Sequence, residues 1–134
     1  MRTQTEEKLQ QDCMLFFTNT YGLKHHNPRL LFYSVANEIG ASVAYSIGKG
    51  KVVTDALSRT MNKFKLTGFK KGVADVHLCF PNGKLVYIEF KTATGRQSAE
   101  QKEFQQQVES LGFKYYIVRS LEEFKEIVEW EIKK

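Results

Sequence analysis

Apolar side chains recur at helical spacing in three segments of the chain, residues 4–19, 52–66 and 121–134. Tyr21-Gly22 closes the first segment. Ser98 and Gln101 fit the N-cap and N3 positions of a capping box, so the third helix is expected to start there and to stop at Gly112. The predicted helices cover residues 4–19, 52–66, 98–112 and 121–134.

Four shorter runs are rich in β-branched and aromatic residues and predict strands. Pro81-Asn82-Gly83 separates two of them and is a strong hairpin signal. The element order is α-β-α-β-β-α-β-α, without an internal repeat or a composition shift, so residues 1–134 are expected to form a single α/β domain. The predicted strands cover residues 30–35, 74–80, 84–90 and 114–119.

The hairpin carries the candidate chemistry, because alternate residues of a strand share one face. Glu89 and Lys91 therefore project together, about 7 Å apart along the strand. A three-residue loop would pair Phe80 with Lys84 and bring Asp75 opposite Glu89. A two-residue Asn-Gly turn would instead set Asp75 opposite Phe90, and only a bulge would restore the pairing.

Two carboxylates opposite each other on a sheet repel by about 4 kcal/mol at ~4 Å and an effective dielectric of 20, so they need compensation. A divalent cation would supply it, since Mg²⁺ is bound by one or two carboxylates, carbonyls and waters. Lys91 would then stand beside the ion, where it could orient a water or offset negative charge. The alternative is a solvated sheet face on which Asp75, Glu89 and Lys91 form an incidental ion pair.

Charge and composition limit the classes of binding partner and the cellular location that we expect. The 134 residues include 20 Lys and Arg against 15 Asp and Glu, which gives a pI near 9.2 and favours a polyanionic partner. Cys13 and Cys79 lack metal or disulfide spacing, and no signal peptide or membrane span is apparent, so we expect a reducing, cytoplasmic location and no membrane partner. The Gly48–Lys51 loop lacks Walker spacing, so no nucleotide cofactor is expected.

Several segments, in order along the chain, carry a family resemblance. Gly72-Val73-Ala74-Asp75, Ile88-Glu89-Phe90-Lys91 and Gly95–Gln101, with Gly112-Phe113 after them, resemble the virus-type replication-repair nuclease (VRR-NUC) family of the PD-(D/E)-x-K superfamily. The likeness is densest over residues 68–120. The chain departs from the family pattern at two positions, where Ala36 and Ala74 stand in place of a frequent Pro. Neither position supplies a metal ligand.

The resemblance implies a restriction-endonuclease-like fold, with a mixed central β-sheet flanked by α-helices, and a set of roles for the site residues. Asp75 and Glu89 would bind Mg²⁺ with help from the Phe90 backbone carbonyl, and Mn²⁺ would substitute. Lys91 would act on the attacking water, and Gln101 would support the site. As the N3 residue of a capping box, Gln101 also has a purely local explanation.

The resemblance also bears on substrate and assembly. Similar stand-alone members act as homodimers that cut branched DNA such as Holliday (four-way) junctions, in DNA repair and recombination. Two other functions stay open: a nicking or flap-directed nuclease of replication, and a catalytically silent DNA-binding module that kept the fold.

Weaker candidates surround this core. Glu6 and Gln10 lie at i and i+4 of the first helix and could both face the sheet, although an acidic residue at a helix start is also favoured by the dipole. Glu38 follows the first strand and could belong to the site, although an ordinary loop carboxylate is the alternative. His77 shares the predicted face of Asp75 and could contact phosphate, although a hydrogen-bonded histidine of the sheet is the alternative. Cations that could contact DNA phosphates, or be ordinary solvated surface, are Lys49, Lys51, Lys70, Lys71 and Arg96.

Overall fold

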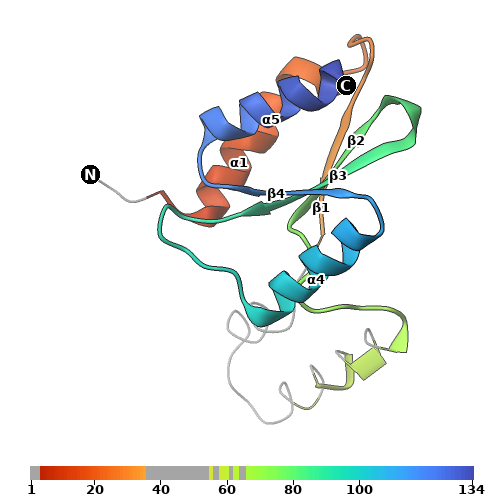
Figure 1. Cartoon of the computed structure of the whole chain (residues 1–134), viewed down its shortest axis with the longest axis vertical. Coiled ribbons are helices and arrows are strands. Elements are labelled where there is room, and N and C mark those ends of the chain that lie inside the picture. The colour runs from red at the N-terminus through yellow and green to blue at the C-terminus, as the bar shows by residue number, and fades with distance from the viewer. Residues whose placement is uncertain (1–3, 36–54, 56–57, 61, 64–65) are drawn as a thin grey trace.

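The computed structural model describes residues 4–35, 55, 58–60, 62–63 and 66–134. Each element follows the predicted order (Figure 1). Helical elements are α1 (Glu6–Phe17), the π-helical turn η1 (Thr18–Gly22), the 3-10 turn η2 (Pro81–Gly83), α4 (Ala99–Ser110) and α5 (Leu121–Lys133). Strands are β1 (Leu31–Ser34), β2 (Val76–Phe80), β3 (Lys84–Phe90) and β4 (Lys114–Val118).

The element boundaries agree closely with the sequence pattern. Ser98 caps α4 and Gly112, at φ +93°, follows its end, both as predicted. Strand β2 begins at Val76, two residues later than predicted. Within the predicted helix at 52–66, the structure describes only some of the residues, and all of these are helical. They are Asp55, Ser58–Thr60, Asn62, Lys63 and Leu66.

The described strands form one mixed sheet in the order β1-β2-β3-β4. Strand β2 pairs antiparallel with both β1 and β3, whereas β4 runs parallel to β3. The parallel pair needs a crossover, and α4 with its preceding loop supplies it. Residues at the C-terminal end of β3 therefore lie beside those at the C-terminal end of β4.

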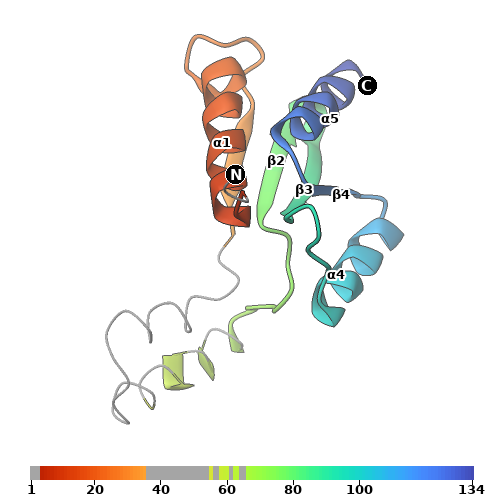
Figure 2. The ribbon, with the colours of Figure 1, turned by 90° about the vertical axis from the view of Figure 1, so that its left-hand side faces the viewer.

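The two faces of the sheet bury different helices. On one face, α1 and α5 pack Phe17 and Phe124 against Val76, Ile88 and other apolar residues of the sheet. On the other face, α4 packs Phe104 and Val108 over β4. Figures 1 and 2 show α4 on the side of the sheet away from α1. Because side chains alternate, odd-numbered residues of β2 and β3 face the α4 side.

Two further expectations concern the cysteines and the membrane. Cys13 and Cys79 both lie in the described residues and are free. Burial is the largest cause that raises the pKa of Cys13, to about 12, so this thiol stays protonated. Among the described residues, no helix has both the length and the apolar composition of a membrane span.

Candidate functional site

The hairpin register decides whether the candidate acids meet. Phe80 pairs with Lys84 around the three-residue turn, and pairing continues to Val76 and Ile88. Asn82 adopts φ 66°, a left-handed conformation that Asn tolerates, and Gly83 follows at φ 73°. The three-residue loop is therefore confirmed and the two-residue turn is wrong. Extended by one position, this register sets Asp75 opposite Glu89, and the Glu89 carboxylate is close enough to raise the pKa of Asp75.

The Asp75 side chain accepts a hydrogen bond from a backbone N–H of β3 at the point where regular pairing between β2 and β3 ends. Its Oδ2 accepts a hydrogen bond of 2.7 Å from the N–H of Phe90, which explains why regular pairing stops at Val76. Burial is the main cause that raises the pKa of Asp75; the Phe90 N–H opposes the rise, and the Glu89 and Glu6 carboxylates add to it. The carboxyl group thus lies where additional positive charge would stabilise its ionised form.

Two other segments, β4 and the loop after β3, hold the Glu89 side chain by hydrogen bonds. This side chain is 1% exposed, and Oε1 accepts hydrogen bonds from the Tyr115 hydroxyl and, at 3.1 Å, from Gln97 Nε2. Gln97 Nε2 also donates to Gln105 Oε1 at 2.9 Å, which connects the loop to α4. The other oxygen, Oε2, is buried and has no hydrogen-bond partner in the described structure. A buried carboxylate oxygen without a hydrogen bond is costly, and the Lys91 ammonium group, 4.0 Å from Oε2, offsets part of that cost.

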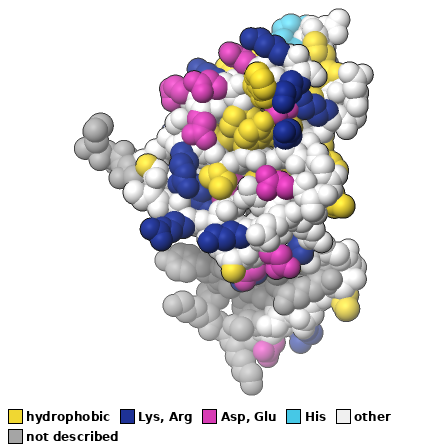
Figure 3. Space-filling model, viewed as in Figure 1, with side chains coloured by type: hydrophobic (Ala, Val, Ile, Leu, Met, Phe, Trp, Pro, Cys, Tyr) yellow, Lys and Arg dark blue, Asp and Glu magenta, His cyan; other side chains and the backbone are white. Residues whose placement is uncertain are grey.

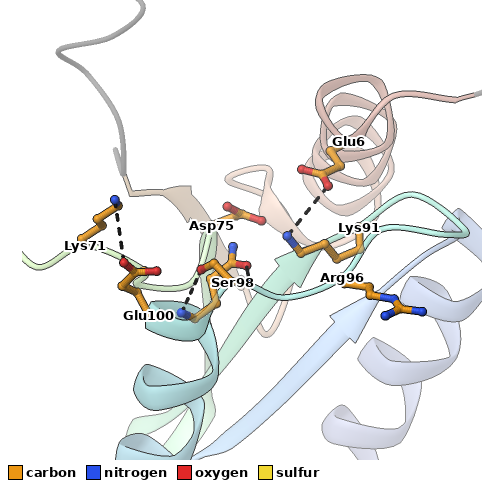
Figure 4. A pocket seen from close by; sticks show the side chains of 9 residues that line it. Glu6, Lys71, Asp75, Lys91, Arg96, Ser98 and Glu100 are labelled. Carbon is orange, nitrogen blue, oxygen red and sulfur yellow. Dashed lines mark hydrogen bonds and ion pairs between the residues drawn. The ribbon is translucent and has the colours of Figure 1, made fainter.

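Lys91 supplies the nearest positive charge. Its Nζ lies 4.0 Å from Glu89 Oε2 and 4.0 Å from Glu6 Oε1, beyond hydrogen-bonding distance of either. The Lys91 side chain is 10% exposed, so its charge acts in a partly dehydrated site. Figure 4 shows Glu6 extending from α1 toward Lys91, with Asp75 beside them.

Helix α1 brings Glu6 to the site. Thr5 caps the helix by accepting a hydrogen bond from the N–H of Lys8, so Glu6 falls in the first turn. A Cβ on Gly95 would lie 3.5 Å from Glu6 Oε1, which shows how closely this carboxylate approaches the loop after β3. The structure thus places Glu6 at the site, whereas Gln10 lines a neighbouring groove and not the pocket that contains Lys91.

The site opens into a pocket of about 490 Å³. Lys71 and Arg96 line it, whereas Lys70 is exposed and is not among the lining residues. Arg119 Nη1 fixes the loop that carries Arg96 by donating to the carbonyls of Thr92 at 2.6 Å and Gly95 at 2.8 Å. In the space-filling view, the described basic and acidic side chains are interspersed on the face that is drawn (Figure 3).

Gly72 lets the chain before Asp75 approach α4. It has φ +84°, and a Cβ there would come within 2.6 Å of the Glu100 carbonyl carbon. Only glycine fits both the backbone conformation and the space. This contact places Lys71 3.8 Å from the Glu100 carboxylate at the pocket rim (Figure 4).

The described structure favours the ordinary interpretation of two predicted residues. Gln101 lines the pocket, but its side chain accepts a hydrogen bond from Ser98 N at 2.8 Å, which completes the capping box. His77 Nδ1 lies 2.9 Å from the Tyr33 hydroxyl, and burial lowers the pKa of His77, as expected of a neutral sheet histidine. Three predicted residues, Glu38, Lys49 and Lys51, lie outside the described residues.

Sequence reasoning missed Gln97 and Tyr115, the two residues that hold Glu89. Strand alternation offered a signal for Tyr115, because it places residues 115 and 117 on the α4 side. Gln97 gave no such signal, since its position depends on a loop fixed by Arg119.

The donor set fits a hard divalent cation held by few protein ligands. Among the described residues, no group of three or more His, Cys, Asp or Glu side chains could hold a metal ion. Mg²⁺ does not need such a group, because it keeps several waters and binds through one or two carboxylates plus substrate phosphate. Asp75 and Glu89 Oε2, which accepts no hydrogen bond in the described structure, meet that requirement.

Comparisons with known proteins agree with this geometry. The family model described as "VRR-NUC domain" matches residues 37–122, more than half of the chain, and this range includes Asp75, Glu89, Lys91 and Gln97 but not Glu6. No curated protein matches the sequence. A solved chain described as "VRR_NUC domain protein" superimposes with a TM-score of 0.68 at 15% identity, covering 99% of this chain and 92% of that one, which supports a restriction-endonuclease-like fold. The chain therefore belongs to the VRR-NUC domain family and is a nuclease domain of the PD-(D/E)-x-K type.

Proposed function

We propose that the protein is an Mg²⁺-dependent, structure-specific DNA endonuclease that resolves four-way junctions or related branched DNA as a homodimer. The observation that carries the metal dependence is the buried Glu89 Oε2, which accepts no hydrogen bond in the described structure, near the Asp75 carboxyl, whose pKa is raised. Lys91 Nζ, 4.0 Å from Glu89 Oε2, compensates this pair only in part, so a bound divalent cation would stabilise it further. Mn²⁺ is expected to substitute, since it accepts the same oxygen ligands.

Each residue of the site would have a separate role in hydrolysis. Asp75 and Glu89 would hold the ion, which when bound polarises a phosphoryl oxygen and lowers the pKa of a coordinated water. Lys91 would orient the attacking water and offset the negative charge that develops on phosphorus oxygens. Tyr115 and Gln97 keep the Glu89 carboxylate in one orientation.

The pocket rim supports DNA as the substrate. Lys71 and Arg96 line the same pocket as Asp75 and Lys91, where they would contact phosphates on either side of the scissile bond. Phosphate contacts of this kind carry no base preference and weaken with salt. The preference for branched DNA and the dimer rest on the resemblance to stand-alone family members, in which twofold symmetry would present two sites to opposed strands.

A panel of labelled DNAs tests the proposal. Four-way junction, flap, nicked and linear duplex DNAs are incubated with the protein in Mg²⁺ or in EDTA, and the molar mass in solution is measured in parallel. We expect paired incisions in the junction, none in EDTA, and the mass of a dimer. Preferential cutting of flaps or nicked DNA by a monomer would replace resolution with the nicking or flap-directed alternative.

Variants distinguish catalysis from mere binding. Asp75→Asn and Lys91→Met should bind junctions and fail to cut them, because the substitutions remove a metal ligand and the ammonium group while keeping side-chain size. Cleavage equal to wild type by both variants would show that these residues are not catalytic. Absence of cleavage by the wild-type protein on every DNA, with binding intact, would favour the silent binding module.

A further inference from the structure

Arg119 contacts the loop that follows β3 at two points. It is the first residue after β4, and its side chain reaches the loop through one nitrogen, Nη1. The loop turns between Thr92 and Gly95, where the N–H of Gly95 donates to the carbonyl of Thr92 at 3.2 Å. Arg119 Nη1 donates to the carbonyls of both residues, at 2.6 Å and 2.8 Å. Because the guanidinium group is always charged, these hydrogen bonds are strong and fix the turn against the end of β4.

This turn is one of two anchors of the loop. At the other end, the Ser98 side chain caps α4 and its backbone N–H belongs to the same capping box. Two residues, Arg96 and Gln97, lie between the anchors. Gln97 Nε2 donates to Glu89 Oε1 at 3.1 Å and to Gln105 Oε1 at 2.9 Å. A displacement of the turn would therefore move the amide that holds the Glu89 carboxylate.

Lys91 is positioned by a different contact. Its backbone N–H donates to the carbonyl of Val118 at 3.0 Å, which extends the contact between β3 and β4 by one residue beyond their regular pairing. This hydrogen bond joins the two strands directly and does not involve the loop. Loss of the Arg119 side chain should therefore free Gln97 to move while Lys91 stays in place.

We propose that Arg119 is a positioning residue of the active site, which holds the loop after β3 so that Gln97 keeps Glu89 oriented toward the metal ion. The inference rests on the proposed metal site of Asp75 and Glu89, and it names a further residue on which that site depends. Arg119 is not among the residues that line the active-site pocket. The charge of Arg119 alone would have the opposite effect, because removal of a cation from the protein favours the binding of another cation. The direction of the change in metal affinity therefore separates positioning from general electrostatics.

Calorimetric titration of Mn²⁺ into DNA-free protein tests the proposal. Without DNA, a contact between Arg119 and a phosphate cannot contribute. In Gln97→Ala, Glu89 keeps the hydrogen bond from Tyr115, so we expect Mn²⁺ affinity to fall about tenfold, the lower end of the range for a residue that orients a metal ligand. Arg119→Met acts one contact further away and should weaken Mn²⁺ binding by about threefold to tenfold. In the Gln97→Ala background, Arg119→Met should have no further effect.

Cleavage rates separate this role from the loss of a catalytic group. With DNA in excess, Arg119→Met should need more Mg²⁺ but reach close to the wild-type rate at saturating Mg²⁺, because Lys91 keeps its backbone contact with Val118. Lys91→Met should stay inactive at every Mg²⁺ concentration. Arg119→Lys retains a charged donor for the two carbonyls and should bind Mn²⁺ more tightly than Arg119→Met.

Arg29 provides a matched control. It is also an exposed arginine, and its Nε donates to the carbonyl of Gly22 at 2.9 Å. Arg29 lines neither of the two described pockets. Arg29→Met therefore removes the same charge and the same kind of contact, and it should bind Mn²⁺ at least as tightly as the wild type. A thermal melt of each variant establishes that it is folded, and Arg119→Gln provides a second neutral variant.

Mn²⁺ affinity at or above the wild-type value in folded Arg119→Met and Arg119→Gln would overturn the positioning role. A loss in Arg119→Met that adds in full to the loss in Gln97→Ala would overturn the route through Gln97. Both outcomes differ from failure of the proposed function, because each requires a wild type that binds Mn²⁺. A wild type that binds no Mn²⁺ would overturn the metal site itself, and this role with it.

Discussion

Adjacent tyrosines in β4 each donate a hydrogen bond to a buried glutamate, and they provide a matched pair of substitutions. Tyr115 donates to Glu89 in the candidate site, and Tyr116, on the opposite face, donates to Glu131 at 2.5 Å. A hydrogen bond to a charged group contributes about 1.5–3 kcal/mol. Tyr115→Phe and Tyr116→Phe should therefore each lower the free energy of unfolding by roughly that amount.

The two substitutions should differ in their effect on function. In Tyr115→Phe, Glu89 keeps only the 3.1 Å hydrogen bond from Gln97 and gains freedom to turn away from the metal position. Loss of a residue that orients a metal ligand typically lowers metal affinity 10–100-fold. Glu131, which Tyr116 contacts, also pairs with Lys84 and takes no part in the candidate site. Tyr116→Phe should therefore leave the Mg²⁺ requirement unchanged.

Urea unfolding gives the stability of each variant, and cleavage rates across a series of Mg²⁺ concentrations give the half-saturating concentration. We expect a rise of at least about tenfold for Tyr115→Phe, with the rate partly restored at high Mg²⁺, and the wild-type value for Tyr116→Phe. An identical Mg²⁺ dependence in the two variants would refute the idea that Tyr115 positions a metal ligand.

Three further predictions follow from other parts of the structure. Because the pKa of Asp75 is raised in the folded protein, the stability of the wild type in EDTA should fall as pH rises from about 4 through that pKa. Asp75→Asn should lack this fall and should melt at a higher temperature than the wild type near neutral pH. Mg²⁺ should not stabilise this variant. Gly72→Ala should cost about 1–3 kcal/mol more in urea unfolding than Gly83→Ala, since both positions have positive φ but only Gly72 has backbone atoms within 3 Å of a new Cβ; equal losses would contradict this. Burial alone would raise the pKa of Glu131, but the pairing with Lys84 holds this pKa below the usual value. The ionised Glu131 therefore stabilises the fold above the ordinary carboxyl range, and this stabilisation is lost as pH falls through the lowered pKa. Glu131→Gln should lower the free energy of unfolding by about 3–5 kcal/mol at neutral pH and leave cleavage per folded molecule unchanged.

Local signals in the sequence offered the correct placement of the central pair of carboxylates as one of two hairpin registers, and the structure decides between the two. The Pro81–Gly83 loop sets the pairing of Phe80 with Lys84, and strand periodicity then carries that register to Asp75 and Glu89. The capping box at Ser98 likewise depends on residues three positions apart and was confirmed. Such features are predictable because the interacting groups are close in the chain.

Contacts between distant segments could not be predicted in the same way. Gln97 reaches Glu89 only because α4 and Arg119 fix its loop, and Tyr115 reaches Glu89 because β4 runs parallel to β3. Sequence reasoning assigned a supporting role to Gln101, whose side chain is engaged in the local cap. The glutamine that contacts the Glu89 carboxylate was identified only by the tertiary structure.

Asp75 and Glu89 are expected to bind one divalent cation together. Electron paramagnetic resonance of Mn²⁺ titrated into the protein measures this binding, because the signal of the free ion decreases as the ion is bound. We expect one bound Mn²⁺ in the wild type, displaced by excess Mg²⁺, with binding lost in Asp75→Asn and Glu89→Gln and retained in Glu131→Gln, which changes another buried glutamate outside the site. Wild-type Mn²⁺ binding in both Asp75→Asn and Glu89→Gln would contradict this expectation.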